Sequence, residues 1–512
     1  MSEFEMQKNA GDYPLTSRKI QSDVIYKEVG ADFVLPDYMG DIKRMLKYTA
    51  SAVPCNKLVS VDEASFLCIV TFRVTYLDSD DMLTEAVFSA DCEVSEKIYS
   101  NVIDADVNYN VQTVSVRLGG PRKISARATV GCNVYAIEEC EICDRAEYDG
   151  AEMLKKEVEI RTAEYLKCSE REYAEQIERI EEISADELEV VKSFGIAFID
   201  AVHKTEGGVN LSGYADALCI LRSDEELIRL EKRIPIEEHI ECELHDGGVF
   251  IPKAYVTGVN VNLNNVNTDD ACAVSVVMNM TVECGVAQHY NEKLSVVSDA
   301  FYEGCKNDCT YQNFEFSRLG DCIYDKASFS ACIDRGEEPL YDVIDREMVI
   351  KNLRYESTGT DITVLCDAEL HMVARGNGAD DCYPIKEKFE FSKKYRLQAS
   401  ENTKIELNAI PCDVSISLDS EKIYVEAQIL VSVLTEIKET ERILANIECE
   451  RVEGCTDRAI VVYYPEKDDT LWSVSKKYAV SPMSIVQKNP NCQLGEDYNL
   501  NVFEMGHIVV AK

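Results

Sequence analysis

The chain has 512 residues, of which 46% are hydrophobic, and a formal net charge of −40 at pH 7. Its length exceeds that of one ordinary domain and its apolar content excludes a mainly disordered protein, so roughly two to four globular domains are expected. The charge argues against nucleic acid or an anionic membrane as a partner bound through bulk electrostatics. It suits a basic partner, or it serves only to keep a large protein soluble.

Cysteine usage and the N-terminal sequence both indicate the cytoplasm. The 21 cysteines are an odd number without a regular framework, which favours a reducing compartment over a secreted, disulfide-bonded protein. The first residues lack the basic start and apolar core of a secretory signal. No window approaches a membrane-spanning apolar run. We therefore expect a cytoplasmic protein that binds no nucleic acid and does not insert into a membrane.

The first third of the chain shows a short helical signal and then alternating strands. Residues 35–46 could begin a helix after Pro36. Small or apolar residues then alternate with mostly polar ones over residues 66–76, and again over 114–118 and 124–134. The last two segments flank a turn sequence, which predicts a long β-hairpin.

The same order of one strand and one hairpin recurs twice more, roughly every 150 residues, which is a domain-sized period. The second copy has a strand at 209–220 and a hairpin at 259–263 and 272–282; the third has a strand at 362–372 and a hairpin at 414–418 and 423–433. Residues 173–183 have apolar residues at helical spacing, but the stretch is short and a twisted strand is the alternative.

Alternation with one polar face predicts antiparallel sheets. The expected fold is mainly β, with three repeated antiparallel sandwich-like or barrel-like domains followed by a small α+β domain of βααβ order. The expected boundaries are 1–150, 151–300, 301–450 and 458–512. Cys132, Cys272 and Cys284 fall on the apolar phase of strands, so we expect them to be small buried hydrophobic residues.

The C-terminal segment predicts a strand, a turn, two short helices and a closing strand. Asp469 and Thr470 lie where an N-cap belongs before a helix over 471–478. Ser481 and Pro482 suit the start of a second helix. From residue 463 onward, five lysines face six acidic residues, so the segment is nearly neutral and the acidic charge lies in the rest of the chain.

This C-terminal segment resembles a LysM module, a small domain that binds ligands and does not catalyse. The three copies before it resemble the SPOCS domain of spore-coat proteins, and residues 34–46 are similar to that family's opening motif. Repeated SPOCS-like units followed by a LysM module resemble the domain order of the SipL-type spore-coat morphogenetic proteins of clostridia. The resemblance covers nearly the whole chain.

The resemblance implies a non-enzymatic scaffold in spore coat assembly. Such a protein is expected in the mother cell at the forespore surface, where its LysM module binds the coat basement-layer ATPase, stage IV sporulation protein A. Other coat proteins are further candidate partners. The alternative is a cell-wall protein that binds peptidoglycan through its LysM module. The sequence Asp468-Asp469-Thr470 replaces the usual Gly-Asp-Thr, which weakens the glycan hypothesis without excluding it.

The partner-binding residues that we predict lie on the surface of the LysM-like segment. They are Asp469, Thr470, Trp472, Lys477, Asn489, Pro490, Met505 and Gly506. Trp472 is the only tryptophan in the chain. It is either a partly buried core aromatic or a partner-facing anchor, because tryptophan is enriched at interface hot spots.

No motif predicts catalysis. Cys140 and Cys143 form a C-x-x-C pair that could bind zinc or act in redox chemistry, but no second pair or nearby histidine completes a zinc pattern. No G-x-x-x-x-G-K-[ST] or H-E-x-x-H sequence is present. We therefore expect neither a catalytic residue nor a metal or other cofactor.

Overall fold

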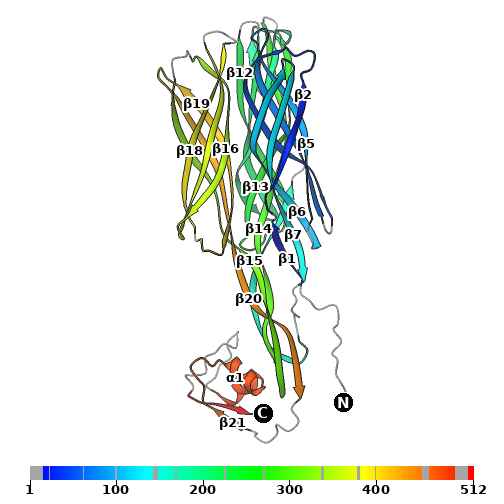
Figure 1. Cartoon of the computed structure of the whole chain (residues 1–512), viewed down its shortest axis with the longest axis vertical. Coiled ribbons are helices and arrows are strands. Elements are labelled where there is room, and N and C mark those ends of the chain that lie inside the picture. Colours follow the sequence, from blue (N-terminus) through cyan, green and yellow to red (C-terminus); the bar gives the residue numbers. More distant parts are fainter. Residues whose placement is uncertain are drawn as a thin grey trace.

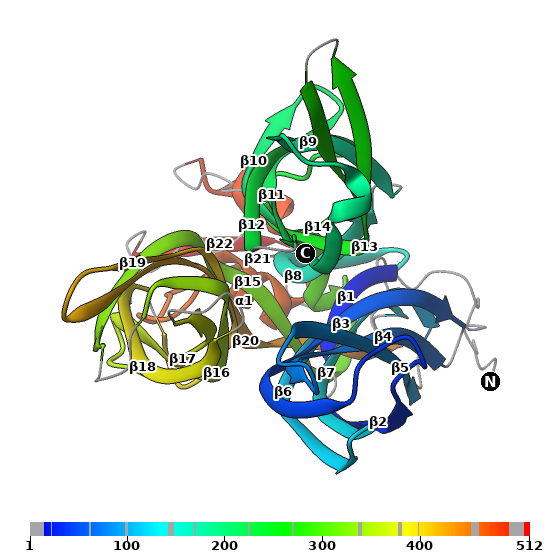
Figure 2. The ribbon, with the colours of Figure 1, turned by 90° about the horizontal axis from the view of Figure 1, so that it is seen from above.

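Three β units lie side by side around a common axis, and long strands descend from them to a small C-terminal module (Figures 1 and 2). The structure is a computed structural model that describes residues 15–21, 23–60, 63–97, 101–141, 148–167, 170–223, 226–268, 271–335, 340–376, 381–397, 399–451, 460–490 and 506–511. All strand pairs in these residues are antiparallel. The prediction of a mainly β, antiparallel fold is confirmed.

Each unit contains two sheets. One is a meander of three consecutive strands. In the other, the last strand of the unit is central and pairs on one side with the strand or strands that begin the unit and on the other side with the next-to-last strand. Unit 1 comprises β1 (Leu15–Gln21), β2 (Ile25–Val34), β3 (Ile42–Val59), β4 (Glu63–Asp78), β5 (Leu83–Lys97), β6 (Asn101–Gly120) and β7 (Lys123–Glu141). Its meander is β3–β4–β5, and β7 pairs with β1, β2 and β6.

Units 2 and 3 repeat this arrangement. Unit 2 comprises β8 (Ala151–Lys167), β9 (Arg171–Glu181), the 3-10 turn Ala185–Glu187, β10 (Glu189–Thr205), β11 (Gly208–Arg222), β12 (Leu227–Glu241), β13 (Val249–Thr268) and β14 (Ala271–Tyr302). Unit 3 comprises β15 (Cys305–Asp334), β16 (Asp342–Ser357), β17 (Asp361–Arg375), β18 (Cys382–Arg396), β19 (Thr403–Leu418) and β20 (Lys422–Arg451). The first strand is split in units 1 and 2 and continuous, as β15, in unit 3.

The alternating residues predicted for the closing hairpins face the unit cores. In β7, β14 and β20 they are at most 3% exposed from Ile124 to Val134, from Val274 to Val282 and from Ile423 to Val433. Cys132 and Cys284 are buried as predicted, but the prediction for Cys272 is wrong, because this cysteine is exposed. It precedes the first core residue of β14, and its thiol donates to the carbonyl of Ile183.

The helix predicted after Pro36 does not form, because residues 42–46 belong to β3 and pair with β4, while a distant arginine binds the turn before them. Arg122 donates to the carbonyl oxygens of Pro36 at 2.7 Å and Met39 at 2.9 Å. Residues 35–41 form a turn that leads into β3. Of the two alternatives for residues 173–183, the strand is correct, since β9 pairs with β14.

The three units, which together we call the head, meet in a buried ion network. Lys47, Lys192 and Asp345 come from units 1, 2 and 3, and each directly follows a β-bulge in the first strand of its meander. Asp345 Oδ2 accepts from Lys47 Nζ at 3.0 Å and from Lys192 Nζ at 2.8 Å. Glu347 and Glu85 pair with the same two lysines at 3.0 Å and 2.9 Å. The network therefore joins all three units and neutralises each buried lysine.

A second buried network joins the units nearer the module. Glu406 of β19 accepts from Lys19 of β1 at 2.9 Å and from Arg161 of β8 at 3.0 Å. The Arg161 side chain is only 1% exposed, and it also pairs with Glu436 of β20. Burial would raise the pKa of Glu406, but Lys19 and Arg161 outweigh burial and lower it to about 2.

Below the head, two antiparallel ribbons form what we call the stem, residues 151–160, 291–302, 305–318 and 437–451 (Figure 1). One ribbon pairs β8 with β14, and the other pairs β15 with β20. The two ribbons share small apolar clusters that include Ile160, Val296 and Ile443. The stem strands are continuations of core strands of units 2 and 3, so the stem is an extension of the head.

D345N should lower the free energy of unfolding by about 3–5 kcal/mol, because it leaves two buried lysines with less negative charge. Urea denaturation of the full chain measures this loss. D81N is the control, since Asp81 pairs with Lys43 where the side chains are 57% and 53% exposed, and it should change stability little. Equal effects of the two variants would contradict a special role for the buried network.

Acid should weaken the head through Glu406. Its pKa is lowered from 4.5 to about 2, so its contribution to stability is complete above pH 4.5 and is lost as the pH falls toward 2. Urea denaturation between pH 5 and pH 2 should show a steeper loss of stability for the wild type than for E406Q. The same pH dependence in both proteins would refute this assignment.

Candidate functional site

The described part of the C-terminal module, residues 460–490 and 506–511, is a two-stranded sheet covered by two short helices. Its elements are β21 (Ile460–Tyr463), α1 (Leu471–Tyr478), α2 (Pro482–Lys488) and β22 (Ile508–Ala511). The small core includes Leu471, Val474, Ile485, Ile508 and Val510. The predicted order of strand, two helices and strand is present.

Two of the predicted site residues determine how α1 begins. Thr470 is the N-cap, and its Oγ1 accepts from the backbone N of Ser473 at 3.1 Å. Asp469 accepts from the Tyr463 hydroxyl and from the backbone N of Glu466, both at 2.7 Å. These contacts account for both side chains as parts of the fold.

Asn489, another predicted site residue, fastens α2 to the closing strand. Its Nδ2 donates to the carbonyls of Ile485 at 2.7 Å and Val509 at 2.8 Å. Its Oδ1 accepts from Val509 N at 2.8 Å. Asn489 is buried, so it holds the module together from within.

Trp472 lies between the module and the lower end of the stem. It is only 5% exposed, and its ring lies 5.2 Å from that of Phe301 on β14, centroid to centroid. Its Nε1 donates to Asp299 Oδ2 at 2.8 Å. The sequence left two roles open for Trp472, a core aromatic or a partner anchor, and in this structure its partner is the stem of the same chain.

Lys476, one helical turn along α1, reaches the same carboxylate. Its Nζ donates to Asp299 Oδ1 and, at 2.9 Å, to the Tyr311 hydroxyl. Burial would lower the pKa of Lys476, but these hydrogen bonds outweigh burial and raise it above 10.5, so the ammonium is charged at neutral pH. A backbone hydrogen bond from Gly304 N to the Ala479 carbonyl, 2.9 Å long, completes the contact. We call Asp299, Phe301, Gly304 and Tyr311 the docking site.

The other predicted site residues divide between the open surface and the part of the chain that is not described. Lys477, Pro490 and Gly506 are exposed. Lys477 Nζ lies 3.2 Å from the Tyr463 hydroxyl. Met505 lies outside the described residues. The eight predicted residues therefore do not form one surface: some build the fold, Trp472 contacts the stem, and three are open to a partner.

The predicted set missed the outer face of the module's own sheet. Ile460 and Val462 pair with Ala511 and Val509, so these four side chains share the face opposite the helices. Ile460, Val462 and the adjacent Tyr464 are 65%, 50% and 72% exposed. A signal was present in the sequence, because residues 460–464 are apolar at every position instead of at alternate ones.

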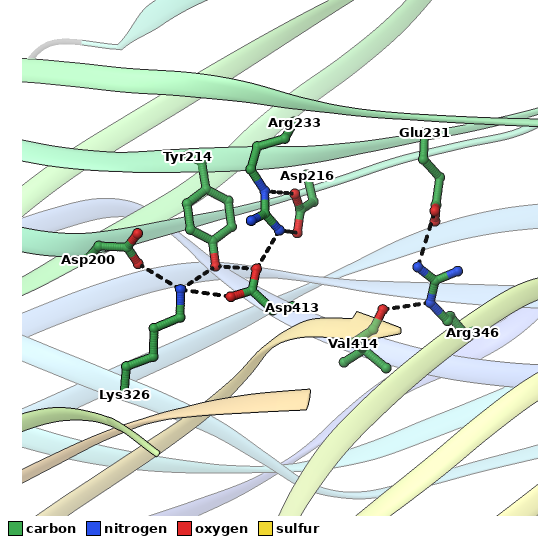
Figure 3. Close-up of polar contacts among 9 residues, drawn as sticks. All are labelled: Asp200, Tyr214, Asp216, Glu231, Arg233, Lys326, Arg346, Asp413 and Val414. Atoms are coloured by element: carbon green, nitrogen blue, oxygen red, sulfur yellow. Dashed lines mark hydrogen bonds and ion pairs between the residues drawn. The ribbon is translucent and has the colours of Figure 1, made fainter. Parts of the chain in front are cut away.

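A groove of about 620 Å³ lies between units 2 and 3, and Figure 3 shows polar side chains in and beside it. Groups in and beside the groove bind one another, both across the unit boundary and, for Asp413 and Lys326, within unit 3. Asp413 accepts from Tyr214 at 2.8 Å and pairs with Lys326 at 2.7 Å and with Arg233. Burial raises the pKa of Tyr214, which keeps its hydroxyl protonated as a donor. The side chains drawn in Figure 3 therefore join the two units.

Neither a metal centre nor a disulfide emerges from the described residues. No three His, Cys, Asp or Glu side chains among them are placed to hold a metal ion. No two of the cysteines whose side chains are described form a disulfide with each other, whereas the side chain of Cys140 and all of Cys143 lie outside the described set. In the same part of the chain, no helix is long and apolar enough to cross a membrane.

No family model, curated protein or solved structure matches this chain. In the described residues, the module has one face against the stem and an apolar sheet face open to solvent.

N489A should destabilise the module by about 1–3 kcal/mol, because it leaves buried backbone groups of α2 and β22 without their partner. Hydrogen exchange of the amides in α2 and β22 of the full chain measures this effect. Q487A, which changes an exposed neighbour, should leave the exchange unchanged. Unaltered protection in N489A would show that Asn489 does not hold the module together.

Proposed function

We propose that this protein is a non-enzymatic scaffold in spore coat assembly, whose C-terminal module binds the basement-layer ATPase. It would act in the cytoplasm of the mother cell, at the forespore surface. The observation that carries this proposal is the open apolar face of the module's sheet, presented at the end of a stem. The resemblance in domain order supplies the identity of the partner.

The apolar face supports a protein partner. A two-stranded sheet normally covers one face and leaves the other polar. The side chains of Ile460, Val462 and Tyr464 instead expose apolar surface to water, and such a patch is typical of protein interaction sites. A glycan would require several polar groups that converge on its hydroxyls, and among Ile460, Val462 and Tyr464 only Tyr464 carries a hydroxyl.

The position of the module supports a scaffold. The buried networks join the three units of the head, and the stem extends from units 2 and 3 by continuous strands. The module lies at the far end of the stem (Figure 1). A partner bound there would be held away from the head, and the head surface would stay available to other coat proteins.

V462K should weaken binding of the full chain to the purified ATPase by about tenfold or more, because it places a charge in the apolar contact. Biolayer interferometry with the chain immobilised measures the affinity. V34K is the matched control, since Val34 is also an exposed valine in a strand, is 66% exposed and lies in unit 1 of the head. Its affinity should equal that of the wild type.

The alternative, a wall-binding protein, has a direct test. The full chain is mixed with purified peptidoglycan and sedimented. Sedimentation with peptidoglycan together with no measurable affinity for the ATPase would replace the scaffold proposal with the wall-binding one. Equal loss of ATPase binding in V462K and V34K would show that the effect is not specific to the module.

A further inference from the structure

The face of α1 that rests on the stem already holds a carboxylate. Asp299 Oδ2 accepts from the indole of Trp472, and Oδ1 accepts from Lys476 and, at 2.7 Å, from the Tyr311 hydroxyl. Two of these donors belong to the module. The arrangement is that of a binding site for an acidic side chain, with the stem as its occupant.

The contact between α1 and β14 depends on the spacing of two residues on the helix and of two residues on the strand. Trp472 and Lys476 are four residues apart, so they lie on the same face of α1. Asp299 and Phe301 are two residues apart on β14, so they point to the same side of the strand. The carboxylate meets the indole N–H and the ammonium, while the Phe301 ring packs against the indole. The face of α1 thus fits an extended segment with an acidic residue two positions before an aromatic one.

The contact is held by side chains at the tip of the stem. Trp472 and Lys476 provide the polar contacts from α1, Ser481 adds a side-chain hydrogen bond with Glu152 of β8, and the Gly304–Ala479 hydrogen bond adds one backbone link. In the described residues, no strand or helix of the module packs lengthwise against a stem strand. An interface of this kind can open without unfolding either part.

We propose that the Trp472–Lys476 face of α1 is a second partner-binding surface, which the stem occupies within the chain and which a partner segment of acidic-aromatic chemistry takes over. This inference rests on the proposed function. The stem and the partner then compete for one face, so the apparent affinity for the partner is reduced by the fraction of chains in which the module is docked.

D299N in the full chain tests this competition. The substitution keeps the size of the side chain but removes the charge that holds Lys476, so the docked state should become less populated. Trp472 is the only tryptophan, so its emission, recorded without partner, reports on the docking site. We expect a red shift in D299N and an affinity for the ATPase about three- to tenfold higher than that of the wild type.

Two further variants make the result specific. K476Q breaks the same contact from the module side, so it should give the red shift but a lower affinity for the ATPase, because Lys476 also serves the partner. D308N removes a carboxylate from an exposed position on the stem strand β15, and it should match the wild type in emission and affinity. Opposite changes in affinity for D299N and K476Q distinguish competition from a general loss of structure.

The outcomes separate the inference from the proposed function. An unchanged emission in D299N would overturn the docking contact. A red shift with unchanged or weaker ATPase binding would overturn the competition. If neither the wild type nor D299N binds the ATPase, the proposed function fails, and partner exchange at this face fails with it.

Discussion

The buried contact among Lys47, Lys192 and Asp345 is the constraint on which the rest of the structure depends. The three charged side chains, one from each unit, are buried in the same contact. The cost of their desolvation is offset by their ion pairs only when all three units are in place. The acid that the two lysines share lies in unit 3, and Glu85 and Glu347 supply the remaining negative charge. The head is therefore one body, and the stem has a fixed base from which to extend.

The same contact explains why the three repeats are not interchangeable. The three positions are equivalent in the repeat, each directly after a bulge in the first meander strand. Identical residues at all three would place like charges against one another in a buried site. Two lysines and one aspartate attract instead, so unit 3, which supplies the aspartate, is not interchangeable with unit 1 or unit 2.

Structure that follows from the local alternation of apolar and polar residues could be predicted from the sequence. Structure that depends on contacts with residues far away in the sequence could not. The hairpins of β6–β7, β13–β14 and β19–β20 follow from period-2 patterns that each strand carries itself. The helix after Pro36 was wrong because residues 42–46 pair with β4 and the turn before them binds Arg122, which is more than 80 positions away. The role of Trp472 stayed open because Asp299, its hydrogen-bond partner, is 173 positions away. The partner of the module is still a prediction, because it rests on resemblance and on an open face.

The continuous pairing of β15 and β20 has a mechanical consequence. The two strands pair from Cys305–Arg451 at the module end to Asp334–Lys422 in unit 3. Their hydrogen bonds run across the strands, so tension applied at the lower end of β20 and directed along the stem loads many of them in shear at once. A strand pair loaded in this way resists separation better than a pair whose hydrogen bonds break one after another from one end. A load applied to the stem in this direction is therefore shared among many hydrogen bonds of the β15–β20 pair.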